Sequence, residues 1–221
     1  MTKQASELAG LTNEDTDAPE SDALERLRIA VARKSEIEAD AAEVEWRRME
    51  ASKDEARIYT FTGPITLDST QYCIDHLGQW HREDPARPIQ IVFNSPGGGV
   101  MDGLALYDYI HEIRSLGTRV DTVVLGFAAS MAAVLLQAGE ERIVGRHAYT
   151  MIHEVSSQAI GSMSELEDAT KFTKQLQGRL LDILADRSTL SRDEIETKWA
   201  RRDWWISSEE AVELGFADTI R

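Results

Sequence analysis

The feature that most constrains this chain is an apolar segment that ends in glycine and is followed, after one serine, by a second apolar segment. Residues 120–125 have the composition of a buried strand, and Gly126 is expected to end it. Residues 131–138 are apolar enough for a buried helix, and Ser130 lies at the junction. A serine at a helix start faces unpaired backbone N–H groups and the positive end of the helix dipole. Taken alone, Ser130 is most simply a helix N-cap. Any further role for Ser130 has to be argued from other residues of the chain.

Strand-like and helix-like segments alternate from about residue 55 onward. Strands are expected over residues 58–62, 89–94, 119–125, 142–144 and 148–152, and helices follow most of them. Three capping-box patterns, which begin at Ser162, Ser191 and Ser207, predict the starts of the last three helices. This alternation predicts an α/β domain whose strands pair largely in parallel.

The N-terminal quarter has a different composition. Residues 1–20 are polar and acidic, which predicts a disordered acidic tail. Residues 21–54 are rich in Ala, Glu, Arg and Leu and contain no Gly or Pro, which predicts a helical extension. Its apolar stripe is ragged, so a coiled coil and a solvated helix docked on another surface both stay open. The predicted organisation is therefore tail, helical extension, and a folded domain over residues 55–221.

Composition limits the class of partner and the compartment. The formal net charge of -15 argues against non-specific binding to nucleic acid and against an anionic membrane surface. The single cysteine, Cys73, excludes an intrachain disulfide and a cysteine-based zinc site, and we expect it to be a buried apolar side chain in a helix. No secretory signal and no apolar run of about 18 residues is evident. We therefore expect a cytoplasmic protein without metal, cofactor or membrane contact.

Two further residues supply chemistry that would suit Ser130. A serine hydrolase needs a nucleophile, a base, an orienting carboxylate and donors for an oxyanion. His153 directly follows an apolar strand, and Asp203 stands between two arginines and two tryptophans. Taken singly, His153 is more simply structural and Asp203 more simply part of a surface ion pair. Spacing cannot decide, because members of a catalytic triad are adjacent in space and not in sequence.

A resemblance to a known family joins these residues. From about Arg57 to Ile220 the chain resembles the proteolytic subunit of the Clp protease family. The resemblance is carried, in order, by residues 93–100 (FNSPGGGV), 126–139 (GFAASMAAVLLQAG), 151–153 (MIH) and 202–211 (RDWWISSEEA) with Gly215 and Asp218. It implies the ββα spiral fold shared with crotonases.

The resemblance also implies roles for individual residues. Ser130 would be the nucleophile, His153 the general base and acid, and Asp203 the residue that orients the imidazole. The backbone N–H groups of Gly98 and Met131 would hold the oxyanion. Gly97 and Gly99, which flank Gly98, would let a substrate backbone come close. The implied function is a serine endopeptidase that cleaves protein or peptide substrates inside a homo-oligomeric ring.

Two departures from the family pattern bear on partners. Family members dock an AAA+ unfoldase beside a short apolar N-terminal segment, which the acidic, helix-prone extension replaces here. Arg201 stands where the family often has an acidic residue that pairs across stacked rings. Between two roles, an unfoldase-coupled chamber and a phage prohead or capsid maturation protease that works without an ATPase, the extension favours the second. The partner would then be a scaffold or capsid protein, in the host cytoplasm or the procapsid.

Two functions of other classes, an acyl-CoA enzyme and an assembly protein, are alternatives to the peptidase. A crotonase-type acyl-CoA enzyme also holds an oxyanion with glycine-rich backbone donors, but it needs no serine, histidine and aspartate in support. A catalytically silent assembly protein would need no intact set of three such residues either. The combination of Ser130, His153 and Asp203 therefore favours the peptidase.

Overall fold

The computed structural model describes residues 28–41, 43 and 56–221 of the chain. They belong to two compact units, Met1–Lys53 and Asp54–Arg221, and each is described by itself. In the first unit, residues 28–41 and 43 are helical with exposed side chains. The helix predicted over residues 21–54 overlaps with this segment, and the predicted disordered tail over residues 1–20 lies outside the described residues. The predicted domain bounds stay predictions.

A largely parallel sheet organises the second unit. Within residues 56–221, seven strands form one sheet in which β1, β2, β3, β4 and β7 follow one another and β5 links β3 to β6. The strands are β1 (Arg57–Thr62), β2 (Ile89–Ser95), β3 (Val120–Ala129), β4 (Arg142–Val144), β5 (Tyr149–Ile152), β6 (Trp204–Ser207) and β7 (Thr219–Ile220). All pairs are parallel except the antiparallel pair of β5 with β6. The mixed α/β fold predicted from the alternation of segments is confirmed.

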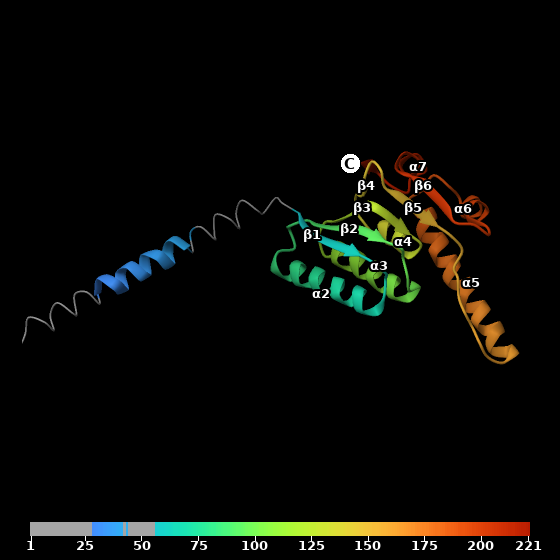
Figure 1. Cartoon of the computed structure of the whole chain (residues 1–221), viewed down its shortest axis with the longest axis horizontal. Helices are drawn as coiled ribbons and strands as arrows, with labels where there is room; N and C mark the ends of the chain where they lie inside the picture. Colours follow the sequence, from blue (N-terminus) through green and yellow to red (C-terminus); the bar gives the residue numbers. More distant parts are fainter. Residues whose placement is uncertain (1–27, 42, 44–55) are drawn as a thin grey trace, which may run out of the picture. The chain divides into compact units, whose positions relative to one another are not determined.

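Helices pack against this sheet. They are α2 (Leu67–Glu83), α3 (Val100–Ser115), α4 (Met131–Leu136), α5 (Met163–Asp186), α6 (Arg192–Trp199) and α7 (Ser208–Glu213). Figure 1 shows α2 and α3 side by side along the sheet, while the start of α5 extends away from the body of the domain. The three predicted capping boxes are confirmed, at Ser162, Ser191 and Ser207. Among the helices that the structure describes, none is long and apolar enough to cross a membrane.

The helix that follows Ser130 lies at the centre of the core. Every residue of α4 is buried, and it packs against β3, α3 and α5. Apolar side chains from β2, α3 and β3, including Phe93, Leu106 and Val124, belong to the same buried cluster. A fully buried helix follows from a sequence that is apolar on every side. The position of Ser130 is therefore determined by the core and not by a surface loop.

The prediction that β3 ends at Gly126 is wrong, because the strand continues to Ala129. β4 pairs with residues 122–124 of β3, and β5 then pairs with residues 127–129, so the second half of the strand has its own partner. Gly126 has a φ of 87°, and a Cβ there would lie 2.8 Å from Oδ1 of Asn94. This left-handed residue bends the strand without ending it.

A buried ion pair attaches the C-terminal segment to the end of α4. The guanidinium of Arg142 is buried and donates to the carboxylate of Asp218, with Nη2 2.6 Å from Oδ1. It also donates to Gln137 and to the carbonyl of Gly215. Partial burial raises the pKa of Asp218, but hydrogen bonds and charge from Arg142, with charge from Arg187, lower it by more. The net pKa lies below the usual range of an aspartate, so the carboxylate stays ionised.

Cys73 has the structural role that its sequence context predicts. It lies on α2, its side chain is fully buried, and its thiol is free. Burial raises the pKa of the Cys73 thiol, which therefore stays protonated. A protonated, inaccessible thiol is an apolar packing group rather than a reactive one.

Candidate active site

Ser130 occupies a strained turn between β3 and α4. Its φ of 56° and ψ of -125° are rare for a residue with a side chain, and the side chain makes no capping hydrogen bond. Ser130 is therefore the N-cap residue of α4 by position, but its side chain does not cap the helix. The backbone N–H of Ser130 donates to the carbonyl of Met151 at 2.7 Å, and its carbonyl accepts from Ala133 at 3.0 Å. Such strain costs about 1–3 kcal/mol and persists only where the surroundings enforce it, as β5 and the buried α4 do here.

His153 reaches Ser130 because their two strands run in parallel. Ala129, the last residue of β3, pairs with Met151 near the end of β5, so the residues that follow both strands emerge at the same edge. Nε2 of His153 lies 2.8 Å from Oγ of Ser130, within hydrogen-bond distance. The imidazole is half-buried. The structure thus brings together two of the predicted site residues that are 23 positions apart.

Asp203 directly precedes β6 and makes no hydrogen bond with His153 among the described residues. The antiparallel pairing of β5 with β6 ends with Ile152 opposite Trp204, so His153 and Asp203 each lie one residue beyond the last pair. Asp203 is exposed, and among the residues described here no hydrogen bond joins its carboxylate to the imidazole. The structure therefore joins Ser130 and His153 by a hydrogen bond and does not join Asp203 to them.

The glycine-rich turn presents an N–H group to the same space. Ile65 forms a parallel bridge with Gly98: it donates to the carbonyl of Gly97 and accepts from the N–H of Gly99, both at 2.9 Å. In a parallel bridge of this kind, the N–H of the central residue faces away from its partner. Within residues 56–221, neither the N–H of Gly98 nor that of Met131 donates to a protein acceptor. Both residues line one cavity with Ser130, so both groups are available to a ligand there.

Only glycine fits at positions 97 and 98 of this turn, because a Cβ would clash with neighbouring atoms and because the backbone angles disfavour a side chain. A Cβ on Gly98, whose φ is 153°, would lie 2.1 Å from the carbonyl oxygen of Ile65. A Cβ on Gly97, whose φ is 88°, would lie 2.5 Å from the carbonyl oxygen of Ala129 and 2.7 Å from Cβ of Ser130. The turn is therefore packed directly against the serine. Gly99 differs, because it is the N-cap of α3 and a Cβ would meet the side chain of Asp102.

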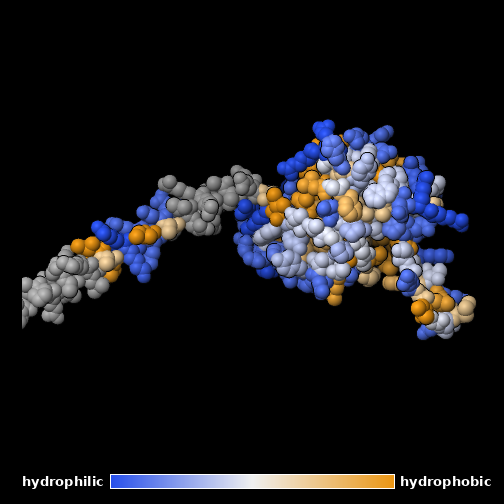
Figure 2. Space-filling view, in the orientation of Figure 1, coloured by the Kyte–Doolittle hydropathy of each residue, from blue (hydrophilic) through white to orange (hydrophobic). Residues whose placement is uncertain are grey.

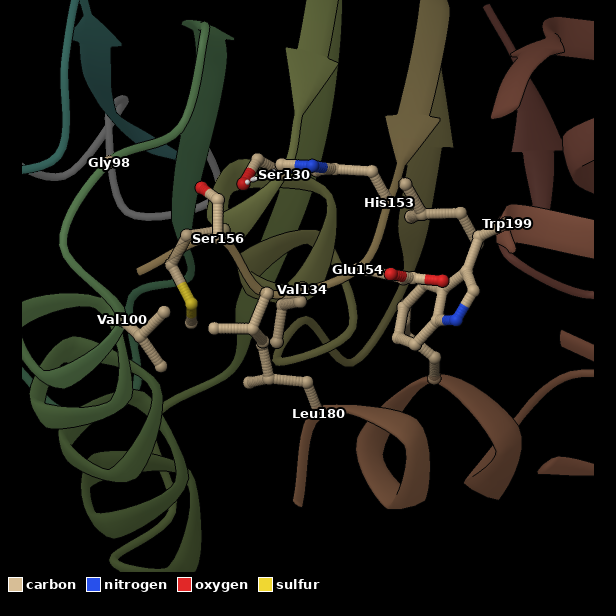
Figure 3. A pocket seen from close by; sticks show the side chains of 13 residues that line it. Gly98, Val100, Ser130, Val134, His153, Glu154, Ser156, Leu180 and Trp199 are labelled. Carbon is tan, nitrogen blue, oxygen red and sulfur yellow. Dashed lines mark hydrogen bonds between the residues drawn. The ribbon is translucent and has the colours of Figure 1, made fainter. Parts of the chain in front are cut away.

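A small cavity of about 50 Å³ opens beside Ser130. Figure 3 shows the hydroxyl of Ser130 and the imidazole of His153 along one side and the indole of Trp199 at the other end. The remaining wall is mostly apolar and comes from α3, α4 and α5, with Val100, Val134, Leu180 and Leu184. Glu154, adjacent to His153 in the chain, also lines it.

These wall residues carry no sequence signal that distinguishes them from ordinary core residues. Leu180 and Leu184 are spaced four apart on one face of α5, which is also what an ordinary core face would show. For Glu154, the position next to His153 is the one sequence signal that could indicate a place in the site.

The described part of the chain offers no obvious metal site. Among its residues, no group of three or more His, Cys, Asp or Glu side chains is placed to hold a metal ion. What the site does present is a serine hydroxyl bonded to an imidazole, on a strained strand-to-helix turn, next to two available N–H groups. This is the arrangement that serine hydrolases use to activate a nucleophile and hold an oxyanion.

Comparison with known proteins identifies the family. The Clp protease family model matches residues 41–221. The ATP-dependent Clp protease proteolytic subunit of Bacteroides thetaiotaomicron is 40% identical over 141 residues, which are 62% of this chain and 61% of that protein. The ATP-dependent Clp protease proteolytic subunit 1 of Chlamydia pneumoniae is 35% identical over 170 residues, 75% of this chain and 87% of that protein. Its counterpart in Chlamydia muridarum is 35% identical over 171 residues, 76% of this chain and 86% of that protein.

These matches and the site geometry point to a serine-type peptidase. The chain belongs to the Clp protease family, as its sequence segments predicted. It spans less than two thirds of the length of the Bacteroides relative and most of the length of the Chlamydia relatives.

Proposed function

We propose that this chain is a serine endopeptidase in which Ser130 is the nucleophile and His153 is the general base and acid. The observation that carries the proposal is the 2.8 Å contact between Oγ of Ser130 and Nε2 of His153. A base within hydrogen-bond reach is what converts a weakly nucleophilic hydroxyl into an effective one. The family of the chain supports the same chemistry.

The reaction follows from the geometry. Oγ of Ser130 attacks the carbonyl carbon of the scissile peptide while its proton passes to Nε2 of His153. The oxyanion that forms accepts hydrogen bonds from the N–H groups of Gly98 and Met131, and such a donor is worth about 3–4 kcal/mol in the transition state. The imidazolium then protonates the departing amine, leaving an acyl-enzyme. Water, deprotonated by His153, attacks the acyl carbon and releases Ser130.

Asp203 would complete the site by accepting the Nδ1–H of His153. The last pair of the β5–β6 ladder, Ile152 with Trp204, directly precedes His153 on one strand and follows Asp203 on the other, which supports this role. The carboxylate would hold the tautomer in which Nε2 can accept the serine proton, and it would stabilise the imidazolium. We therefore assign Asp203 as the orienting residue.

The exposed face beside the site supports assembly into a ring. Tyr149 pairs with Phe127 across β3 and β5, Met151 pairs with Trp205 across β5 and β6, and the next row of the same face holds His153 and Asp203. Tyr149 and Trp205 are 50% and 49% exposed, and Phe127 is half-buried beside them. A continuous aromatic surface of this kind is typical of a contact between proteins. We propose that a second copy covers it, which would also bury Asp203.

A second apolar surface lies at the protruding start of α5. Ile160 and Met163 are exposed there, and this end of the helix is orange in Figure 2. Phe172, farther along the helix, is also exposed. Two separate apolar surfaces on one domain fit a subunit that contacts more than one copy. The native mass of the purified protein would test the homo-oligomer.

The relatives bear on the partner of this assembly. The relatives described above are named as subunits of an ATP-dependent protease. We accordingly propose an AAA+ unfoldase as partner, ahead of the phage scaffold or capsid protein that the N-terminal extension suggested. Proteins or peptides are the proposed substrates. The phage maturation role and the cytoplasmic location stay predictions.

Replacing the nucleophile tests the proposal directly. Ser130→Ala should abolish both hydrolysis of a fluorogenic peptide and covalent labelling by a fluorophosphonate. Its melting temperature should stay at or above the wild-type value, since alanine removes the hydroxyl and little else. Ser115→Ala, at an exposed serine on α3, is the matched control and should keep both activities. Labelling that persists in Ser130→Ala would show that another residue is the nucleophile.

A further inference from the structure

The turn between α6 and β6 is strained and directly precedes Asp203. Arg201 has a φ of 58°, one of two such values among the described residues other than glycine, and Ser130 has the other. The turn is closed from within by Arg202, whose N–H donates to the carbonyl of Trp199 at 3.1 Å and whose Nε donates to that of Lys198 at 2.7 Å. A left-handed residue with a side chain is unfavourable unless its surroundings hold it.

One hydrogen bond joins the strained residue, Arg201, to a side chain outside the turn. The backbone N–H of Arg201 donates to Oε1 of Glu154 at 3.1 Å. This bond joins residues 47 positions apart in the sequence. Glu154 follows His153 directly, and Arg201 stands two residues before Asp203. The bond therefore links the segment that carries the histidine to the segment that carries the aspartate.

The position of this bond matters because the backbone ladder stops short of the site. The pairing of β5 with β6 ends at Ile152 and Trp204, one step before His153 and Asp203. Beyond that step, the side chain of Glu154 accepts a backbone N–H from Arg201, in the turn that leads into β6. Without it, the strained turn could relax and move Asp203 away from the imidazole.

Glu154 also shares a cavity with Trp199, the last residue of α6. It lines the cavity beside Ser130 together with Trp199, and Figure 3 shows its carboxylate toward the indole end of that cavity. The indole Nε1–H of Trp199 is buried and has no hydrogen-bond partner among the residues described. A carboxylate on the same cavity wall is the kind of acceptor that such a donor requires. Glu154 is therefore bonded to the turn at Arg201, and Trp199, where the turn begins, lines the same cavity.

We propose that Glu154 is a positioning residue, which holds the 199–202 turn so that Asp203 stays in place relative to His153. The inference deepens the proposed function and rests on it. Glu154 takes no part in bond making, since its carboxylate is engaged with the backbone of Arg201. Its removal should therefore lower kcat and leave KM nearly unchanged, because the apolar side chains of the cavity beside Ser130 stay in place.

Two substitutions of Glu154 distinguish the effect of its hydrogen bond to the turn from the effect of its negative charge. Glu154→Ala removes the acceptor and should lower kcat on the order of tenfold to a hundredfold, the scale set by a small misplacement of a catalytic group. Glu154→Gln keeps an oxygen at the same position without the charge, and should retain kcat within about threefold. Glu213→Ala, at an exposed glutamate on α7, is the control for loss of an acidic residue and should match wild type.

A third substitution tests the strain itself. Glycine adopts a φ of 58° without penalty, so Arg201→Gly should restore part of the activity that Glu154→Ala loses. In the wild-type background Arg201→Gly should change kcat little. A proposal based on charge alone would predict no such rescue.

Hydrogen exchange gives a readout that does not depend on activity. Amides of residues 199–203 should exchange faster in Glu154→Ala than in wild type, and Glu154→Gln should not differ from wild type. Equal exchange and equal kcat in all three proteins would overturn the positioning role, as would a Glu154→Gln variant as slow as Glu154→Ala. If wild type shows no Ser130-dependent turnover but the exchange difference is present, the proposed function fails and the role of Glu154 in holding the turn stands.

Discussion

Replacement of Gly98 by alanine tests the oxyanion assignment at its most constrained point. The added Cβ would lie 2.1 Å from the carbonyl oxygen of Ile65 and 2.8 Å from its nitrogen. Both atoms belong to the bridge that aims the N–H of Gly98 away from Ile65. Real Cβ atoms do not approach backbone this closely, so the turn has to shift. The shift moves the N–H relative to Ser130.

The expected loss of kcat in Gly98→Ala follows from the contribution of one oxyanion hydrogen-bond donor. Removing a single oxyanion donor lowers kcat by about 10²–10³, equivalent to about 2.7–4 kcal/mol. We expect Gly98→Ala to fall in this range. The free energy of unfolding of Gly98→Ala should also be lower by about 1–3 kcal/mol, because a residue with a side chain is forced into a sparsely populated backbone region.

A matched glycine separates the two effects. Gly117, just after α3, has a φ of 97°, and a Cβ there would meet nothing within 4 Å. Gly117→Ala should therefore lower the melting temperature by strain alone and leave kcat per folded molecule within about threefold of wild type. Peptide turnover should be measured for both variants, normalised to the folded fraction from thermal melts. Equal normalised activity in the two variants would refute the assignment of Gly98.

Three further predictions concern other parts of the chain. Asp203→Asn should lower kcat by orders of magnitude, though less than Ser130→Ala, because the imidazole loses its orienting acceptor; wild-type kcat in this variant would remove Asp203 from the site. The pKa of Asp218 is lowered in the folded protein, so its pairing with Arg142 stabilises the fold above the unfolded value of about 3.9 and is lost as pH falls through the folded pKa. The melting temperature of wild type should thus exceed that of Asp218→Asn at pH 5, and the difference should shrink as pH drops toward 2. A difference in melting temperature that stays constant over this range would contradict the prediction. Deleting residues 1–52 should leave a folded domain that reacts with a small activated ester but assembles or captures proteins differently; an unfolded truncated protein would show that the extension belongs to the core.

Local sequence determined the elements around the site. The apolar residues 131–138 produced a helix that is buried on every side, and the capping boxes at Ser162, Ser191 and Ser207 began their helices where predicted. These signals act over a few residues, through side-chain burial and through hydrogen bonds to the nearest free N–H groups. The family segments also placed Ser130 and His153 in one site before any geometry was known, and the hydrogen bond between their side chains agrees with that placement.

Tertiary structure alone decided how those residues work together. The backbone angles of Ser130 come from the pairing of β3 with β5 and the burial of α4, and neither is visible in the residues near it. Likewise the outward N–H of Gly98 depends on a bridge to Ile65, and the support of the turn before Asp203 depends on Glu154. These contacts join residues that are distant in the sequence, 47 positions apart for the bond between Arg201 and Glu154, so strand register and packing determine them. Local propensity, which extends over a few residues, carries no information about register between distant strands.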